Sequence, residues 1–155
     1  MSEIHVGEIV PDFELPATGN QTVRLSDLRG KKVVLYFYPK DSTPGCTREG
    51  QDFRDHIQAF EKLDTVILGV SRDTLRSHEK FKEAQCFPFG LLSDKDASLC
   101  SRFGVIKEKI MYGRKVMGIE RSTFLIDAEG VLRREWRKVK VDGHVAEVLN
   151  AVERL

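Results

Sequence analysis

Apolar runs alternate along this chain with segments in which apolar residues recur at helical spacing. Val33 to Tyr38 and Thr65 to Val70 are nearly continuous apolar runs, as expected for strands that are covered on both faces. Between them, Phe53, Ile57 and Phe60 recur at i, i+4 and i+7, which is the pattern of a helix with one buried face. These segments predict a strand, a helix and a second strand in succession.

The rest of the pattern completes a small α/β domain. A turn signal at Gly19-Asn20 predicts an N-terminal β-hairpin. Further along we expect a helix over Thr74–Gln85, a strand over Phe89–Asp94, a helical turn over Ala97–Phe103, a hairpin over Lys109–Gly118, a second hairpin over Ser122–Asp127 and Val131–Trp136, and a helix over His144–Leu155. This order predicts a three-layer α/β/α fold with a mixed central sheet. No repeat or linker divides residues 1–155, so we expect a single domain.

The composition excludes several classes of protein but does not identify a binding partner. The 25 basic and 24 acidic residues leave a net charge of +1, which is unlike a strongly cationic binder of nucleic acid or membranes. The N-terminus lacks the pattern of a secretory signal, and no apolar segment approaches the length of a membrane span. Cysteines at 46, 86 and 100 are odd in number and have no Cys-x-x-Cys spacing, unlike a disulfide framework or a structural zinc site. We therefore expect a cytoplasmic protein.

The stretch PKDSTPGCTRE, residues 39–49, places one cysteine directly behind the first apolar run. Thr43 is expected to cap the next helix with its hydroxyl, with Pro44 at the first helical position. The N–H groups of Gly45 and Cys46 then lie in the first turn, without intrahelical acceptors, and could hold a developing oxygen charge. A helix start favours the reactive thiolate and can lower a thiol pKa from roughly 8.5 into about the 3.5–7.5 range. Gly45 has no side chain, so a small substrate could approach the sulfur.

The same stretch also fits a plainer interpretation. Pro-Gly before a helix is common, and Cys46 then packs as a small buried residue. A thioredoxin-type pair is disfavoured because Glu49 stands where Cys-x-x-Cys spacing needs a second cysteine.

Two longer stretches resemble a known family. FYPKDSTPGCTREGQDFRD resembles the active-site signature of peroxiredoxins, thiol peroxidases of thioredoxin-like fold, and is most similar to the bacterioferritin comigratory, or Q-type, branch. MYGRKVMGIERSTFLID resembles a second stretch of that branch, and the similarity extends from about Val6 to the end of the chain. The combination of P-x-x-x-T-x-x-C with a distant E-R-S-T-F-L-I-D is specific. The resemblance implies a thioredoxin-like fold and chemistry without a metal, haem or flavin cofactor.

The resemblance also implies roles for five residues. Cys46 would be the peroxidatic cysteine, which peroxide oxidises to a sulfenic acid. Thr43 would contact the peroxide and the sulfur through its hydroxyl, and Pro39 would shield the pocket from water. Arg121 would lower the pKa of the thiol and polarise the peroxide O–O bond, and Glu49 would hydrogen-bond and orient Arg121.

The chain departs from the branch at the resolving cysteine. Gln51 and Lys82 occupy the two positions at which members of the branch carry it. Cys86 lies four residues beyond the second position and is a candidate for an atypical two-cysteine route, which would require local unfolding. Cys100 is expected to be a packing residue. We favour a one-cysteine route in which thioredoxin, glutaredoxin or a small-molecule thiol reduces the sulfenic acid.

The sequence therefore predicts a cytoplasmic thiol peroxidase, monomeric like much of its branch, that reduces hydrogen peroxide and organic hydroperoxides and protects the cell against oxidative stress. Two alternatives are a peroxide sensor with little turnover and a non-catalytic thioredoxin-like module with a buried Cys46. The four histidines show no ligand spacing, and the basic residues near 107–115 fit a solvated hairpin. No metal, nucleic acid or membrane partner is predicted.

Overall fold

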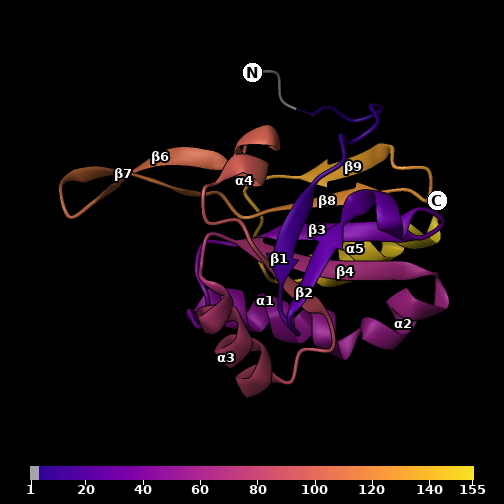
Figure 1. Ribbon diagram of the computed structural model, residues 1–155, viewed down its shortest axis with the longest axis horizontal. Helices are drawn as coiled ribbons and strands as arrows, with labels where there is room; N and C mark the ends of the chain where they lie inside the picture. The colour runs from indigo at the N-terminus through magenta and orange to yellow at the C-terminus, as the bar shows by residue number, and fades with distance from the viewer. Residues whose placement is uncertain (1–3) are drawn as a thin grey trace.

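The computed structural model describes residues 4–155, so residues 1–3 of the expected domain lie outside the described residues. Its strands form a seven-stranded sheet and a separate two-stranded ribbon (Figure 1). In chain order, the elements are β1 (Glu14–Ala17), β2 (Gln21–Arg24), the 3-10 helix η1 (Leu25–Leu28), β3 (Lys32–Phe37), α1 (Pro44–Asp55), α2 (Ile57–Lys62), β4 (Thr65–Ser71), α3 (Leu75–Gln85), β5 (Gly90–Ser93), α4 (Ser98–Arg102), β6 (Ile106–Met111), β7 (Arg114–Ile119), β8 (Ser122–Ile126), β9 (Leu132–Trp136) and α5 (His144–Glu153).

The large sheet is mixed, as the sequence predicts. Its strand order is β2-β1-β5-β4-β3-β8-β9. The strands β3, β4 and β5 are parallel, whereas β8 pairs antiparallel with β3 and the β1–β2 hairpin pairs antiparallel with β5. The strand β3 therefore lies in the interior of the sheet, and every residue from Val33 to Tyr38 is buried.

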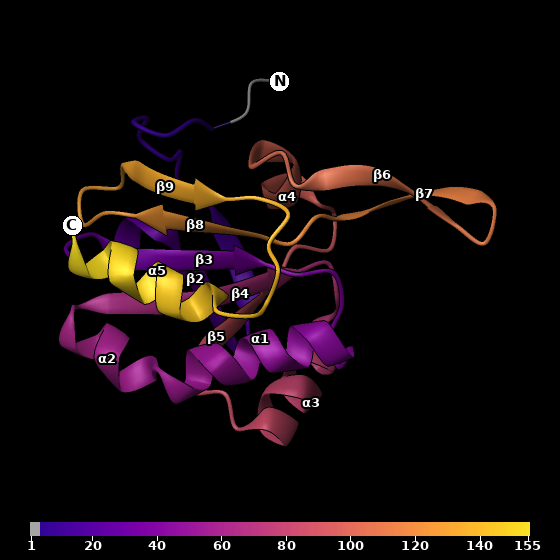
Figure 2. The same ribbon diagram turned by 180° about the vertical axis from the view of Figure 1, so that it is seen from behind.

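Alternate residues of β3 enter two separate apolar clusters on opposite faces of the sheet. Val34 and Tyr36 belong to a cluster that includes buried residues of α1, α2, α3 and α5. Leu35 and Phe37 belong to a cluster that includes residues of α4 and of β1. Figure 2 shows α5 in front of the first of these faces. The three layers are confirmed, although the helices are divided unequally between the two faces.

The helical pattern through Phe60 is divided between two helices. The sequence predicts an unbroken stripe, but α1 ends at Asp55 and α2 begins at Ile57. The ring Nδ1 of His56 lies 2.8 Å from the carbonyl oxygen of Asp52, while the backbone N–H of His56 donates to Phe53. The side chain thus takes the acceptor that an α-helical backbone bond would use. Within residues 4–155, no helix has the length and apolar character of a membrane span.

The expected hairpin over Lys109–Gly118 is confirmed and is longer than the sequence indicates. The strands β6 and β7 form a ribbon that extends away from the large sheet (Figure 1). Tyr112 and Gly113 at its tip have φ values of 52° and 75°. Two consecutive residues with positive φ are typical of the tight turn that joins antiparallel strands. The basic side chains Lys107, Arg114 and Lys115 are exposed.

Candidate active site

Strand pairing brings two distant parts of the sequence to the same edge of the sheet. The end of β3 leads through residues 38–43 into α1, which carries Cys46 in its first turn. Because β8 is antiparallel to β3, Phe37 at the end of β3 pairs with Ser122 at the start of β8. Arg121 immediately precedes Ser122 and therefore lies beside the start of α1. The topology, rather than any local motif, joins these residues.

The guanidinium group of Arg121 connects the sulfur of Cys46 with the carboxylate of Glu49. Its Nη2 donates to Cys46 Sγ at 3.4 Å, and its Nη1 donates to Glu49 Oε1 at 2.6 Å. The Cys46 residue is 2% exposed and Glu49 is fully buried. Glu49 lies three residues after Cys46, so both side chains can face Arg121 from one side of α1. The predicted contacts of Arg121 with Cys46 and Glu49 are present.

Gly45 lies close to the guanidinium group of Arg121. A Cβ atom at this position would lie 3.1 Å from Arg121 Nη2, which is tighter than ordinary van der Waals contact. The sequence suggests that Gly45 leaves room for a substrate. In the structure the missing side chain also leaves room for the arginine that contacts Cys46.

Burial changes the protonation of the pair that Arg121 forms with Glu49. Loss of solvent raises the pKa of Glu49 from 4.5 to about 7, although the charge of Arg121 and its hydrogen bond act to lower it. Burial acts to lower the pKa of Arg121, but the charges of Glu49 and Cys46 outweigh it, so the pKa is raised. Glu49 Oε2 has no hydrogen-bond partner within the described part of the chain. The arginine is therefore a fixed cation beside the sulfur, held by one carboxylate oxygen.

The role of Thr43 as a helix cap differs from the expectation. Thr43 occupies the N-cap position with φ −85° and ψ 155°, and Pro44 follows it at the first helical position, as predicted. Its hydroxyl makes no capping bond and instead donates to the carbonyl oxygen of Lys40 at 2.8 Å. The hydrogen-bond ladder of α1 begins with the N–H of Thr47, which donates to the Thr43 carbonyl, so the N–H groups of Gly45 and Cys46 precede it.

Pro39 lies between the end of β3 and the start of α1, where the family pattern needs it. The residue is exposed in the structure. Its expected role in shielding the sulfur from water stays a prediction.

The other two cysteines lie in contrasting environments. All three cysteines are free thiols. Cys100 is fully buried, and burial together with the hydrogen bond and charge of Asp94 raises the pKa of its thiol. Cys86 is exposed and ends α3 in a left-handed conformation with φ 55°. Cys100 is therefore the packing residue that the sequence predicts, and Cys86 is accessible.

Cys86, at the end of α3, lies beside a later part of α1 than the turn that carries Cys46. The residue before it, Gln85, accepts hydrogen bonds from Gln51 and Arg54, which are five and eight residues beyond Cys46 on α1. At a rise of 1.5 Å per residue, these contacts lie about 7 to 12 Å from Cys46 along the helix axis. The Cα atoms of a disulfide are rarely more than about 7 Å apart. This offset is consistent with the expectation that a Cys46–Cys86 disulfide needs local unfolding.

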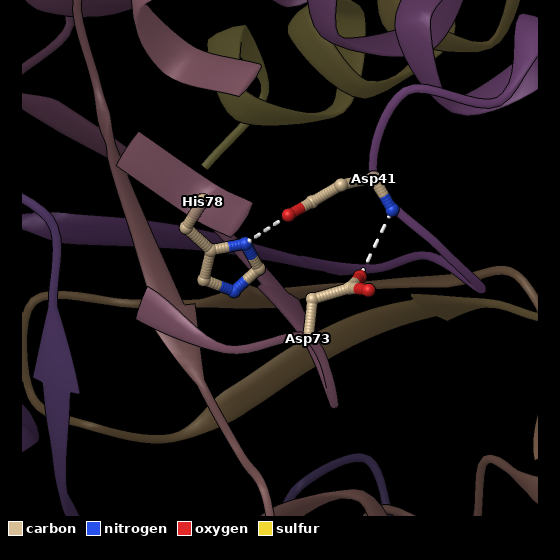
Figure 3. A group of neighbouring side chains, drawn as sticks. All are labelled: Asp41, Asp73 and His78. Atoms are coloured by element: carbon tan, nitrogen blue, oxygen red, sulfur yellow. Dashed lines mark hydrogen bonds and ion pairs between the residues drawn. The ribbon is translucent and has the colours of Figure 1, made fainter. Parts of the chain in front are cut away.

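Asp41, Asp73 and His78 form a cluster that sequence spacing did not indicate, in which Asp41 and His78 are buried and Asp73 is half-buried. One side-chain donor atom from each lies within 4.8 Å of the others, as in a metal site (Figure 3). Asp41 and Asp73 accept hydrogen bonds from neighbouring side chains, and His78 has both ring nitrogens beside oxygen acceptors. A metal ligand needs a ring nitrogen without hydrogen, so these contacts fit a hydrogen-bond network better than a metal centre.

Comparisons with known proteins agree with this geometry. A family model described as AhpC/TSA family matches residues 6–135. The peroxiredoxin Bcp of Bacillus subtilis is 55% identical over 97% of this chain and 96% of its own length. A putative peroxiredoxin bcp of Coxiella burnetii is 53% identical over 94% of this chain and 97% of its own.

Solved structures give the same result for the fold. A bacterioferritin comigratory protein of Xanthomonas campestris, studied for alkyl peroxide reduction, is 51% identical with a TM-score of 0.88 over 92% of this chain and 90% of its own. A PrxQ mutant of Xylella fastidiosa is 45% identical with a TM-score of 0.94, covering 99% of this chain and 98% of its own. The predicted thioredoxin-like fold is confirmed.

Proposed function

This chain belongs to the AhpC/TSA family as a peroxiredoxin of the bacterioferritin comigratory type, a thiol-dependent peroxidase, and we propose that it reduces hydrogen peroxide and organic hydroperoxides through a sulfenic acid at Cys46. The X. campestris relative is described for alkyl peroxide reduction, which supports organic hydroperoxides as substrates. Protection of the cell against oxidative stress follows from this reaction. The cytoplasmic location and the monomeric state stay predictions.

The first step transfers one oxygen atom from the peroxide to the sulfur. The Cys46 thiolate attacks the terminal oxygen of the peroxide, so that an S–O bond forms and the O–O bond breaks. The sulfur loses two electrons and becomes a sulfenic acid, while the departing oxygen takes a proton and leaves as water or an alcohol. Negative charge moves from the sulfur to the departing oxygen during this step, so cationic and N–H groups around both atoms stabilise the transition state.

One observation carries this proposal: a single half-buried guanidinium contacts both the nucleophile and a buried carboxylate. Because Glu49 holds Nη1 of Arg121, Nη2 is fixed toward Cys46 Sγ. The positive charge is already in place to stabilise the negative charge that develops on the departing oxygen. The N–H groups of Gly45 and Cys46 lie at the same helix start. We assign to Thr43 the role of accepting a hydrogen bond from the peroxide, because its hydroxyl hydrogen already binds Lys40.

The second step uses a thiol from outside the chain. The external thiol attacks the sulfur of the Cys46 sulfenic acid, water leaves, and a mixed disulfide forms. A second thiol then attacks that disulfide and releases the Cys46 thiol. The offset between Cys46 and Cys86 in the direction of the α1 axis supports this one-cysteine route. Thioredoxin, glutaredoxin and small-molecule thiols are the reductants to compare, and the atypical route through Cys86 is the alternative.

Intact-mass measurement after one equivalent of peroxide tests both steps. The wild type and Cys86→Ser should each gain about 16 mass units, the mass of one oxygen, whereas Cys46→Ser should gain none and lose peroxide turnover while remaining folded. A loss of about two mass units by the wild type, absent from Cys86→Ser, would establish the intramolecular disulfide instead. Full peroxide turnover by Cys46→Ser would overturn the proposed function altogether.

A further inference from the structure

A buried hydrogen-bond network holds the loop that joins β3 to α1. Asp41 Oδ1 accepts from the hydroxyl of Tyr38 at 2.6 Å, and Asp41 Oδ2 accepts from Ser77 Oγ at 2.7 Å and lies 2.7 Å from His78 Nδ1. The backbone N–H of Asp41 donates to Asp73 Oδ2 at 2.9 Å. Figure 3 shows the last two contacts converging on the loop from different elements. Asp41 is 5% exposed and His78 is fully buried, so solvent cannot replace these bonds readily.

The ring of His78 extends this network to the central sheet. Its Nε2 lies 2.9 Å from the carbonyl oxygen of Leu92 in β5, which can only accept a hydrogen bond. Its Nδ1 faces a carboxylate that already accepts from two hydroxyl groups. One hydrogen therefore lies between His78 Nδ1 and Asp41 Oδ2, and another lies between His78 Nε2 and the Leu92 carbonyl, so the ring is hydrogen-bonded on both sides. Through this pair, β5 and α3 fix the loop that precedes Cys46.

The loop of residues 39–43 has few other contacts that fix its conformation. Residues 39–43 lie outside the strands and helices, so sheet pairing does not fix them. Ser42, directly after Asp41, has φ 63°, a left-handed conformation that is unfavourable for a residue other than glycine. The next residue is Thr43, and Cys46 follows three residues later. A strained loop with one strong anchor beside the site transmits any movement of that anchor directly to the sulfur.

We propose that Asp41 and His78 are positioning residues for the peroxide step: their hydrogen-bonded pair holds the start of α1 so that Cys46 Sγ stays against Arg121. This inference rests on the proposed function. Loss of the pair allows the start of α1 to shift, which separates the sulfur from the guanidinium and slows attack on peroxide. The reduction of the sulfenic acid is not slowed, because a displaced sulfur is easier for an external thiol to reach. Slower oxidation without slower reduction distinguishes positioning from a general loss of structure.

Two substitutions of His78 form a matched test. In His78→Asn the amide nitrogen can take the place of Nδ1 and keep the bond to Asp41, whereas in His78→Gln it can take the place of Nε2 and keep the bond to Leu92. His78→Gln should slow Cys46 oxidation by about 10- to 100-fold, the range expected when a reacting group is misplaced by about 1 Å. His78→Asn should slow it by less than about threefold. Rapid-quench mass spectrometry gives the oxidised fraction of Cys46 over time, and a second mixing experiment with dithiothreitol gives the reduction rate.

Two further variants separate positioning from stability. Ser77→Ala removes one bond to Asp41 from the half-buried rim and should slow oxidation in the same direction, by about two- to fivefold. Val148 in α5 belongs to the apolar cluster that contains Val34 and Tyr36 and makes no contact in the hydrogen-bond network of Asp41. Val148→Ala should therefore destabilise the fold but leave the rate of oxidation unchanged. Urea unfolding measures the stability of each variant, so that oxidation rates can be compared between variants of similar stability.

The outcomes are distinct. Faster oxidation of His78→Asn than of His78→Gln, with reduction by dithiothreitol no slower in His78→Gln, supports the inference. Equal oxidation rates in the two variants, or a slower reduction step in His78→Gln, overturn it, and if both fail to fold, an unchanged rate in Ser77→Ala does so. A wild-type protein that shows no oxidation of Cys46 contradicts the proposed function instead.

Discussion

Replacing Glu49 with glutamine tests whether the buried carboxyl beside Arg121 makes stability depend on pH. Burial raises the pKa of Glu49 from 4.5 to about 7. Between these values the folded protein keeps a proton that the unfolded chain has lost, so stability falls as the pH rises. At about 1.4 kcal/mol for each pH unit, the effect amounts to about 3 kcal/mol over the whole range. Below pH 4.5 the contribution is fully present, and above pH 7 it is lost.

A second buried group acts in the opposite direction. Burial lowers the pKa of His144 from 6.5 to about 4. Between these values the unfolded chain binds a proton that the folded protein excludes, so stability rises with pH by about 3 kcal/mol. The two ranges overlap. The wild type should therefore change by less than about 1 kcal/mol between pH 5 and pH 7.5, because two contributions of about 2 kcal/mol nearly cancel there.

Urea unfolding followed by circular dichroism, in reducing buffer at these two pH values, measures the difference. Glu49→Gln has no carboxyl to titrate, so it should gain about 2 kcal/mol between pH 5 and pH 7.5 from His144 alone. The carboxyls with lowered pKa values, Asp12, Asp96 and Asp127, are ionised in both states above pH 5 and do not contribute. If the pH dependence of Glu49→Gln were the same as that of the wild type, the reasoning about the buried carboxyl would be refuted.

Three other changes follow from single contacts. Thr43→Ala should lower the free energy of unfolding by less than about 0.5 kcal/mol in urea unfolding, because the Thr43 hydroxyl does not cap α1. Thr74→Ala should lower it by about 1 kcal/mol, because Thr74 Oγ1 accepts a hydrogen bond from a helix N–H. Equal losses in the two variants would contradict this. Gly50→Ala should lose about 1–2 kcal/mol in the same assay, since its Cβ would lie 2.3 Å from the Phe87 ring, and a stabilised variant would show that the ring can move. Arg121→Lys keeps the charge but cannot make both guanidinium contacts, so the rate of the peroxide step in rapid-quench experiments should fall about 10- to 100-fold; an unchanged rate would show that charge alone suffices.

Much of the fold could be predicted because its signals are local. The continuous apolar run at Val33–Tyr38 requires cover on both faces, and β3 has it. The break at His56 could not be predicted, because it depends on one ring reaching the carbonyl oxygen of Asp52. The capping role expected for Thr43 was wrong for a similar reason: its hydroxyl could bind either the helix or the Lys40 carbonyl, and the sequence does not distinguish these acceptors.

By itself, the sequence determined which residues could carry the chemistry. The Pro44-Gly45-Cys46 helix start is a local feature, since the cap position and the first turn follow from neighbouring residues. Its resemblance to a family pattern added Arg121, 75 residues away.

Only the tertiary structure decided how distant groups meet at this sulfur. The antiparallel pairing of β8 with β3 brings Arg121 to Cys46, and the exclusion of water around Glu49 raises its pKa. The contact between Asp41 and His78, 37 residues apart, likewise exists only after β3, α3 and β5 have packed. Contact distance and burial depend on the path of the whole chain, and residue spacing along the sequence carries neither.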